Sequence, residues 1–377
     1  MRIFHIITGL NDGGAESVLF RLCAFDKLAQ HHVISLMDAG KYGPLLREAK
    51  VPVTCLEMPQ GRVTPSGLWR LWRLLRSEKP DAVQTWMYHA DLIGGVVARV
   101  AGVRRVFWGI RHSNLNPNLT KRSTIGVARV CAMLSPVVPT RVVCCAGKAL
   151  EAHRMLGYNT RKLLVIPNGY DLARFAPDAA GRQRVREELG VADGQLLLGM
   201  VGRFDPLKDH KNLLSALALL KLRGLDFVAV LVGRGLEDRN AHLCSLLQEF
   251  DLAGQLRLVG QCADVPGVMN ALDLHVLSSA SEGFPNVVAE AMACGTPVAV
   301  TDVGDAAAIV GHTGWVVPPR DAVALAGVIQ EAYEAMRDAP AWRSRKQAAR
   351  RRVAVNFGLD RMIKRYHDLW ANGGQES

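Results

Sequence analysis

Short apolar runs alternate along this chain with longer segments of mixed polarity. Runs of this kind, separated by helix-length segments, are typical of buried strands in parallel sheets joined by crossover helices. The pattern predicts two doubly wound, Rossmann-like α/β domains that face a central cleft, with ligands at the carboxyl ends of the strands. The predicted strands are residues 3–8, 32–36, 53–56, 82–85, 106–110, 141–145 and 163–166 in the first half, and residues 196–201, 228–232, 256–259, 274–277, 297–301 and 315–317 in the second.

The boundary between the two halves is predicted near the turn Pro167-Asn168-Gly169. The stretch from there to residue 194 is polar, charged and rich in alanine, and we interpret it as the linker. A break at residues 357–358 precedes a last predicted helix over residues 359–371. We expect an N-terminal domain over residues 1–172, a C-terminal domain over residues 173–357 and a C-terminal helix over residues 358–377.

Composition narrows the classes of partner. The 377 residues include 46 lysines and arginines against 35 aspartates and glutamates, a formal charge of +11. This excess suits a nucleotide diphosphate, an anionic membrane surface or nucleic acid. Nucleic acid is disfavoured because no RNA-recognition aromatic motif or zinc-finger spacing is present. The chain lacks an apolar stretch of about 18 residues and a signal-peptide cleavage site, so we expect a cytoplasmic protein.

The cysteines and histidines show no metal-binding pattern. The eight cysteines are scattered without a C-x-x-C pair, and the eleven histidines show neither H-x3-H nor H-E-x-x-H spacing. Free thiols in a reducing compartment explain the cysteines better than disulfides or zinc. We therefore expect no metal and no cofactor.

Residues 281–302, S-E-G-F-P-N-V-V-A-E-A-M-A-C-G-T-P-V-A-V-T-D, predict a loop, a helix and a strand. Pro285 suits the first helical position, and Gly295 suits the C-terminal stop. The first N–H groups of this helix, near Phe284, Asn286 and Val287, lie at its positive dipole end and can receive a diphosphate.

Two glutamates flank this predicted phosphate site. Seven residues separate Glu282, on the loop, from Glu290, about one turn into the helix. Carboxylates accept hydrogen bonds from sugar hydroxyls. The segment therefore predicts a nucleotide-sugar pocket.

The E-x7-E spacing around G-F-P-N, followed by G-T-P-V, resembles the signature of glycosyltransferase family 4, whose members are retaining transferases with two Rossmann-like domains (the GT-B fold). The resemblance extends over nearly the whole chain. It implies that Glu290 holds the ribose hydroxyls and Glu282 the hydroxyls of the donor sugar. Neither residue is expected to act as a covalent nucleophile.

Two further strand-to-helix loops support the resemblance. Arg203 and Lys208 lie five positions apart after a predicted strand, where both can reach one diphosphate, and they match the family's R-x4-K pair. Gly13 and Gly14 permit close approach of a phosphate and unusual backbone angles, and the string G-G-A-E is similar to the family's N-terminal loop. The loop is not G-x-G-x-x-G, which disfavours nicotinamide binding.

Two histidines of the first half are candidate site residues. The resemblance implies that His112, in W-G-I-R-H-S-N, lines the donor sugar at the reacting carbon, and Arg111 departs from the commonest form of that motif. His89 is a candidate for contact with the acceptor. For both, a structural role as a hydrogen-bonded histidine stays open.

Two other positions differ from the family's usual pattern. Tyr170 stands where I-P-N-G-V-D has valine, and Gly304-Asp305 stands where two glycines are common. The second departure puts in doubt any contact made by the second glycine's backbone.

Residues 68–76 predict a basic amphipathic helix. A crossover helix that packs its apolar stripe on the sheet is the preferred interpretation, and contact with an anionic membrane is a compatible alternative. The apolar face holds Leu68, Leu71, Trp72 and Leu75, with Arg70, Arg73 and Arg76 nearby.

Together these features predict a retaining, metal-independent glycosyltransferase. It would move a sugar from a nucleotide-diphosphate sugar, with a UDP-sugar favoured, to a saccharide or lipid-linked acceptor in cell-surface polysaccharide or glycolipid synthesis. Fixed positive charge would stabilise the leaving diphosphate in place of a metal. A non-catalytic sugar- or nucleotide-binding module of the same fold is the alternative, and a basic nucleic-acid-binding protein is a weaker one.

Overall fold

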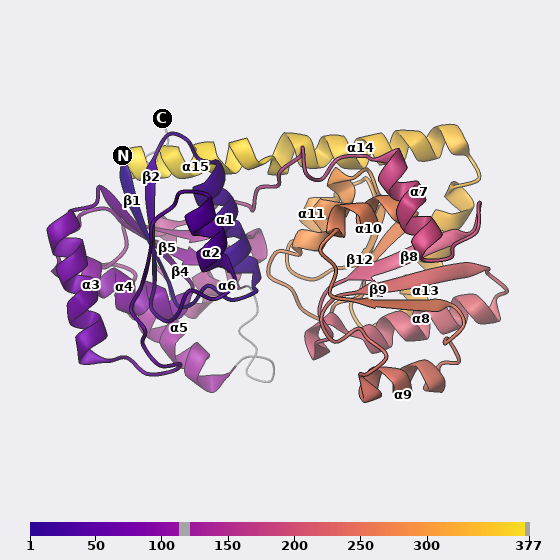
Figure 1. Ribbon diagram of the computed structural model, residues 1–377, viewed down its shortest axis with the longest axis horizontal. Helices are drawn as coiled ribbons and strands as arrows, with labels where there is room; N and C mark the ends of the chain where they lie inside the picture. The colour runs from indigo at the N-terminus through magenta and orange to yellow at the C-terminus, as the bar shows by residue number, and fades with distance from the viewer. Residues whose placement is uncertain (113–120, 374–377) are drawn as a thin grey trace. The chain divides into compact units, whose positions relative to one another are not determined.

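The computed structural model describes residues 1–112 and 121–373. They form two compact units, one of Met1–Gly169 with Leu359–Ser377 and the other of Tyr170–Gly358. Figure 1 colours the chain from indigo at its N-terminus to yellow at its C-terminus. The sequence placed the corresponding divisions at residues 172–173 and 357–358.

The first unit is built on a seven-stranded parallel sheet in the order β3-β2-β1-β4-β5-β6-β7. Its strands are β1 (Arg2–Ile7), β2 (Gln30–Ser35), β3 (Val53–Cys55), β4 (Ala82–Trp86), β5 (Val106–Ile110), β6 (Arg141–Cys144) and β7 (Leu163–Val165). Its helices are α1 (Gly14–Phe25), α2 (Tyr42–Glu48), α3 (Pro65–Glu78), α4 (Tyr88–Val100), α5 (Arg122–Leu134), α6 (Gly147–Leu156), the short η1 (Thr160–Lys162) and α15 (Leu359–Asn372).

The second unit is built on a six-stranded parallel sheet in the order β10-β9-β8-β11-β12-β13. Its strands are β8 (Leu196–Val201), β9 (Phe227–Val232), β10 (Leu256–Gly260), β11 (Leu274–Leu277), β12 (Val298–Thr301) and β13 (Trp315–Val317). Its helices are α7 (Ala179–Glu188), η2 (Pro206–Lys208), α8 (His210–Leu222), α9 (Ala241–Glu249), α10 (Val265–Ala271), α11 (Asn286–Ala293), α12 (Ala306–Val310), α13 (Ala322–Ala335) and α14 (Ala339–Phe357).

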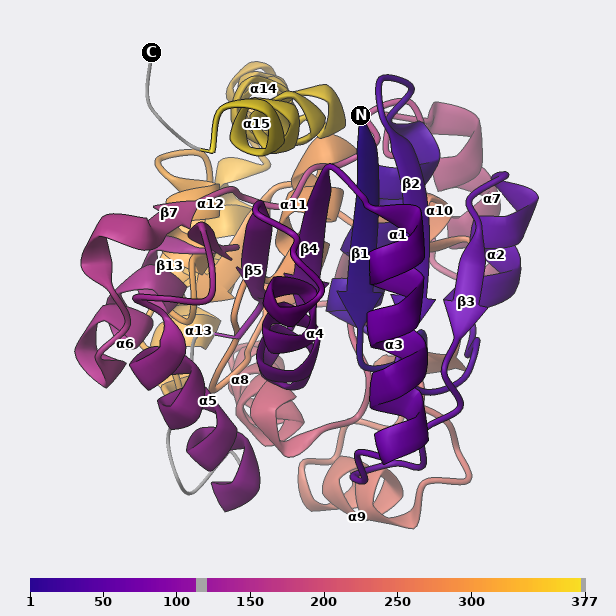
Figure 2. The same cartoon turned by 90° about the vertical axis from the view of Figure 1, so that its left-hand side faces the viewer.

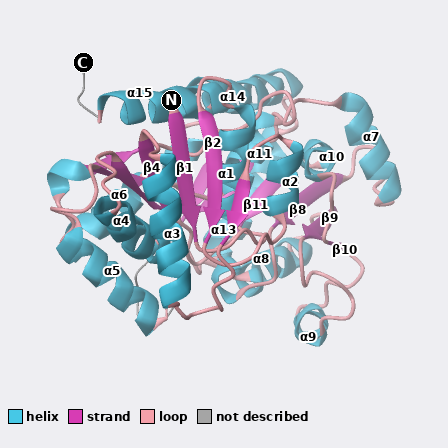
Figure 3. Cartoon of the chain, turned by 60° about the vertical axis from the view of Figure 1, so that its left-hand side comes forward, coloured by secondary structure: helices cyan, strands magenta, loops and turns pink. Residues whose placement is uncertain are grey.

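The predicted α/β class and every predicted strand are confirmed. In each unit the strands lie inside and the helices outside (Figure 3), and strands such as β5 and β8 are buried along their whole length. Burial on both faces is why these strands appear in the sequence as continuous apolar runs. The strand order reverses direction between β1 and β4 in one sheet and between β8 and β11 in the other, and ligands bind beside such switch points.

Helix α15 belongs to the first unit, where it lies beside β1 and β2 (Figure 2). Its buried side chains, among them Tyr366 and Trp370, join the same core as Leu22 of α1 and Trp86 of β4. His367 Nε2 also donates to Asp26 Oδ2 at 2.6 Å. Apolar burial and a partly buried hydrogen bond therefore both hold α15 on the first unit.

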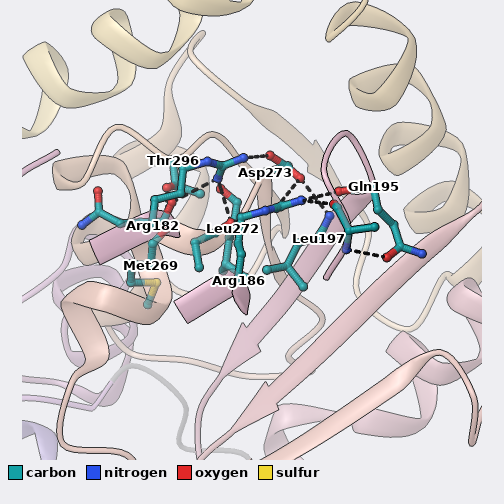
Figure 4. A network of polar contacts seen from close by, with 11 residues as sticks. Arg182, Arg186, Gln195, Leu197, Met269, Leu272, Asp273 and Thr296 are labelled. Carbon is teal, nitrogen blue, oxygen red and sulfur yellow. Dashed lines mark hydrogen bonds and ion pairs between the residues drawn. The ribbon is translucent and has the colours of Figure 1, made fainter. Parts of the chain in front are cut away.

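The interpretation of the stretch up to residue 194 as a linker was wrong. This stretch contains α7, which lies in the second unit and packs on α10. Arg182 Nη2 lies 2.5 Å from Asp273 Oδ1 and Arg186 Nη1 lies 3.2 Å from Asp273 Oδ2 (Figure 4). Arg182 Nη1 also donates to the carbonyl of Ala271 at 2.7 Å, at the negative end of α10. Arg182 and Arg186 of this segment turn inward to Asp273, which the composition of the segment does not reveal.

We expect Asp273→Asn to lower the free energy of unfolding by about 3 kcal/mol, because it leaves two arginine side chains, 31% and 11% exposed, without their carboxylate. Urea denaturation followed by circular dichroism measures the change. Asp251→Asn is the matched control, since its carboxylate is exposed and pairs with Lys221 at the surface, and it should leave stability unchanged. Equal losses in the two variants would contradict a structural role for the Asp273 network.

Candidate functional site

The loop after β8 carries the two predicted diphosphate ligands. Asp205 accepts from the backbone N–H of Leu207 at 2.9 Å and so caps η2. Its other oxygen accepts from Arg203 Nε at 2.9 Å. Lys208 ends η2, and its Nζ lies 2.6 Å from Glu282 Oε1. The loop thus presents one half-exposed arginine and one largely buried lysine, whose side chains are 52% and 19% exposed.

The loop after β11 is bonded to the loop after β8. Ser279 Oγ donates to Glu282 Oε1 at 2.6 Å, the same oxygen that meets Lys208. Ser278 Oγ donates to the carbonyl of Lys208 at 3.1 Å, and Ala280 N donates to that of Leu207 at 2.9 Å. Because β8 and β11 are neighbours in the sheet, their carboxyl ends bring the predicted Lys208 and Glu282 together.

Helix α11 begins one residue later than predicted. Asn286 is its first residue, and Pro285 precedes it as the N-cap, with an extended backbone (φ −74°, ψ 92°). That ψ angle is outside the helical range, so Pro285 turns the chain into the helix instead of starting it. Gly295 lies just past the C-terminus at φ +80°, as expected.

The predicted donor-binding residues of this segment divide by burial. No side chain caps the N-terminus of α11. The ring of Phe284 is buried and packs on the ring of Phe357, with centroids 5.8 Å apart, so only its backbone is available to a ligand. Asn286, Val287 and Glu290 are partly exposed. Glu290 is the fifth residue of the helix, on the turn after Asn286.

The loop after β12 closes against Glu282 and Gly283. A Cβ at Gly304, whose φ is +52°, would come within 2.3 Å of the carbonyl oxygen of Gly283, so glycine is required there. Asp305 has φ −91°, which any residue adopts, and its N–H donates to Gly283 O at 3.3 Å. Aspartate in place of the second glycine therefore causes no backbone strain.

The glycines after β1 differ from expectation in one respect. Gly13 is extended (φ −147°, ψ 166°) and Gly14 begins α1, so neither needs the unusual backbone angles that glycine allows. A Cβ at position 13 would lie 2.3 Å from Glu16 Oε2, the far end of a flexible side chain that can shift, so packing does not require glycine there either. Burial raises the pKa of Glu16, which sits in the first turn of α1.

His89 and His112 follow adjacent strands of the first unit. His89 is exposed and is the second residue of α4, after β4. His112 is partly buried after β5, and the rest of its predicted motif, Ser113 and Asn114, lies outside the described residues. Between β4 and α4, Met87 has φ +72° and ψ 156°, angles that are rare outside glycine and are found where function or packing enforces them.

Sequence reasoning missed a buried carboxyl group in α4, two residues after His89. Asp91 Oδ1 accepts from Thr85 Oγ1 at 2.5 Å and from the N–H of Gly109 at 3.1 Å, which joins α4 to β4 and β5. Burial raises the pKa of Asp91 to about 8, far above the usual range of an aspartate. An acidic residue one turn into an apolar helix was the available signal. Ser278 and Ser279, polar residues directly after a buried strand, were missed in the same way.

One group of potential metal ligands lies elsewhere among the described residues, in the core of the first unit: His5, Cys23 and His31. Trp86 Nε1 donates to His5 Nδ1 at 3.2 Å, so the proton of His5 lies on Nε2 and is shared with His31 Nδ1 at 2.9 Å. His31 Nε2 in turn donates to Asp26 at 2.9 Å. Burial lowers the pKa of His5 well below its usual value, in keeping with a neutral ring. A metal would have to displace the proton between the two rings.

The predicted amphipathic helix is α3, with one difference. Leu71 and Leu75 are buried, but Trp72, expected on the same face, is 37% exposed, and Trp69 is 55% exposed. Arg70 donates to the carbonyls of Cys55 and Leu56, and Arg73 stacks over the ring of Trp69 at 5.2 Å. No described helix has both the length and the apolarity needed to cross a membrane.

Comparison with known families matches both halves of the chain. Residues 12–174 match the model "Glycosyltransferase Family 4" and residues 181–351 match "Glycosyl transferases group 1". A UDP-Gal:alpha-D-GlcNAc-diphosphoundecaprenol alpha-1,3-galactosyltransferase of Escherichia coli is 31% identical over 237 residues, 62% of this chain and 60% of that protein. A putative glycosyltransferase of Bacillus subtilis, EpsF, is 25% identical over 328 residues, 80% of this chain and 79% of that protein. The match thus spans less than two thirds of the length of the first relative.

Solved structures agree over almost the whole chain. Anabaena Alr3699/HepE in complex with UDP covers 99% of this chain and 100% of its own, with a TM-score of 0.86 and 23% identity. WaaG, a glycosyltransferase involved in lipopolysaccharide biosynthesis, gives a TM-score of 0.74 at 18% identity, over 99% of this chain and 100% of its own. With two α/β units and a family model matched in each half, the chain is a protein of the GT-B fold that resembles glycosyltransferase family 4.

Proposed function

We propose that the chain is a retaining glycosyltransferase that uses a nucleotide-diphosphate sugar, with a UDP-sugar favoured as donor. The observation that carries the proposal is the pairing of Lys208 with Glu282 at adjacent strand ends, beside Arg203 and the uncapped N-terminus of α11. Solved structures of the same fold contain UDP and UDP-glucose, and the Escherichia coli relative is named for UDP-Gal. These names support the choice of nucleotide.

The two cations suit the leaving diphosphate. Breaking the bond to the sugar builds negative charge on the diphosphate, and preorganised positive groups stabilise that charge. Arg203 offers a planar fork and Lys208 a point charge. Each is already oriented by a carboxylate, Asp205 and Glu282 respectively. We therefore propose that fixed charge, with the N-terminus of α11, does the work that a metal does in other transferases.

The Lys208–Glu282 pair also suggests how the donor lies. In a sugar diphosphate the sugar hydroxyls and the phosphates are neighbouring groups. The ammonium of Lys208 and the carboxylate of Glu282 lie 2.6 Å apart, so the phosphate would bind at Lys208 and the neighbouring sugar hydroxyls at Glu282. Glu290, further along α11, would then bind the ribose hydroxyls.

We propose that the first unit binds the acceptor. His112 would line the donor sugar at the reacting carbon, and His89, exposed at the start of α4, would contact the acceptor. Gly13 and Gly14 would admit a phosphate at the N-terminus of α1. No protein base is assigned, because in the proposed same-face route the leaving phosphate takes the acceptor proton.

The acceptor is proposed to be a saccharide or lipid-linked saccharide for cell-surface polysaccharide or glycolipid synthesis, at the cytoplasmic face of a membrane. The Escherichia coli relative is named for a diphosphoundecaprenol acceptor. On α3 Trp69 and Trp72 are exposed and Arg73 stacks over the ring of Trp69, an arrangement suited to an anionic bilayer surface. Attachment of this kind is peripheral and reversible.

Arg203→Ala and Lys208→Ala should each lower turnover by about 10²–10³-fold, the loss seen when one preorganised charge is removed. The measurement is UDP release from UDP-glucose and UDP-galactose at saturating donor, with and without chelator. Lys211→Ala is the matched control, since Lys211 is an exposed lysine of α8 that pairs with Glu249. Near-normal turnover in both site variants would remove them from the site. Loss on chelation that Mg²⁺ or Mn²⁺ restores would refute the metal-independent mechanism.

Glu290→Ala should weaken UDP binding about tenfold, because a carboxylate that accepts ribose hydroxyls is lost. Glu282→Ala should leave UDP affinity nearly unchanged and reduce discrimination between UDP-glucose and UDP-galactose. Isothermal calorimetry with UDP and competition between the two donors measure the effects. Equal losses of UDP affinity would contradict the division of roles.

The protein should sediment with phosphatidylglycerol vesicles at low salt and be released as salt rises, since each surface cation contributes about 1 kcal/mol that salt screens. The variant Trp69→Ala/Trp72→Ala/Arg73→Glu should stay in the supernatant. Lys364→Glu, which makes the same charge change on the exposed face of α15, should still sediment. Equal recovery of all three proteins, or equal binding to neutral vesicles, would assign α3 to sheet packing alone.

A further inference from the structure

The chain passes from the first unit to the second between Gly169 and Tyr170. We call residues 168–170 the crossing segment. The side chains that flank Gly169 are almost completely buried, with Asn168 4% and Tyr170 0% exposed. Each makes a short hydrogen bond within its own unit: Asn168 accepts from Arg111, and Tyr170 donates to Asn286. Each end of this short segment is therefore tied to the unit to which it belongs.

Tyr170 is bonded to the first residue of the proposed diphosphate helix. Its hydroxyl donates to Asn286 Oδ1 at 2.6 Å. Its N–H donates to the carbonyl of Phe357 at 2.9 Å, and the residue pairs with Gly358, where the chain leaves the second unit. The hydroxyl bond fixes the plane of the Asn286 amide, with Oδ1 toward Tyr170 and the N–H₂ group on the opposite side. A valine here, as in the family's usual turn, has no hydroxyl to make this bond.

Arg111 is bonded to the crossing segment from within the first unit. Its Nη1 donates to Asn168 Oδ1 at 2.6 Å, and its Nη2 donates to the hydroxyl of Tyr366 on α15. The guanidinium lies over the ring of Trp86, 4.6 Å from the centroid. Arg111 directly precedes His112. A planar guanidinium held on three sides fixes the backbone from which the histidine projects.

We propose that Tyr170 and Arg111 are positioning residues for sugar transfer, each acting through its neighbour. Tyr170 orients Asn286 at the diphosphate helix, and Arg111 holds the end of β5 so that His112 is placed at the reacting sugar. Both are positions at which the sequence departs from the family's commonest pattern. This inference rests on the proposed function and predicts different kinetic consequences for the two residues.

The first test is a double-mutant cycle on UDP affinity, measured by calorimetry. Tyr170→Phe should weaken UDP binding about 2–10-fold, the range for one lost hydrogen bond. The same substitution made in an Asn286→Ala background should have no further effect. Tyr88→Phe is the matched control, because it removes a buried hydroxyl bond of 2.7 Å to His153 in the first unit, and its UDP affinity should equal that of the wild type.

The second test separates turnover from binding. Arg111→Lys keeps the charge but loses the fork, and it should lower turnover of UDP-glucose about tenfold with UDP affinity and melting temperature unchanged. Arg99→Lys is its control. Arg99 also donates to several backbone carbonyls of the first unit, those of Val138 and Arg104 among them. If replacing any such arginine by lysine lowered turnover, the loss would appear in both variants.

The outcomes distinguish the two levels of the proposal. A wild-type protein that neither binds UDP nor releases it from either donor would overturn the proposed function, and the inference with it. If the wild type binds and releases UDP, two results would overturn only the positioning role of Tyr170. One is that Tyr170→Phe binds UDP as tightly as the wild type. The other is that Tyr170→Phe weakens UDP binding equally in the wild-type and in the Asn286→Ala background. Equal turnover in Arg111→Lys and wild type would overturn positioning of His112.

Discussion

The ion pair between Lys208 and Glu282 determines the arrangement of the proposed donor site. Its side chains are only 19% and 12% exposed, so both charges lose much of their hydration, and a partly buried pair of this kind adds little net stability. Its consequence is geometric. Together with the Ser279 hydroxyl it holds the loop after β8 against the loop after β11, at the point where the strand order reverses. A diphosphate bound there, as proposed, would meet charges already in place, which is the condition under which electrostatic stabilisation is most effective.

The fold could be predicted from the sequence because the pattern that indicates it, short apolar runs separated by helix-length segments, is local. Strands buried on both faces must be apolar along their length, and crossover helices must separate them, so the strand runs were visible without any knowledge of packing. The errors arose where polar side chains face inward or apolar ones outward. Helix α7 was mistaken for a linker because its Arg182 and Arg186, which look like solvent-exposed charges in the sequence, pair with the buried Asp273. Trp72 was placed in the core by its periodicity, but the structure leaves it 37% exposed.

Sequence motifs predict only those parts of the proposed site whose residues lie close together along the chain. The spacing of Glu282 and Glu290 and the pair Arg203–Lys208 each lie within one strand-to-helix connection, where a few residues determine the geometry. Contacts between distant segments leave no such pattern. Arg111 and Asn168 are 57 positions apart and Tyr170 and Asn286 are 116 apart, and nothing in either segment indicates its partner. Arg111 and Tyr170 were visible in the sequence only as departures from a resemblance, without a physical reason.

Where the chain enters and leaves the second unit, its residues contact the helix at which the diphosphate is proposed to bind. Tyr170 pairs with Gly358 through the backbone and reaches Asn286 through its side chain. Phe357, next to Gly358, packs on Phe284 just before α11. Residues at the beginning and the end of the unit therefore both contact the N-terminus of one helix. The hydrogen bond of Tyr170 and the ring contact of Phe357 both act on residues at this N-terminus, so a shift of either chain segment would reach the N–H groups at which the diphosphate is proposed to bind.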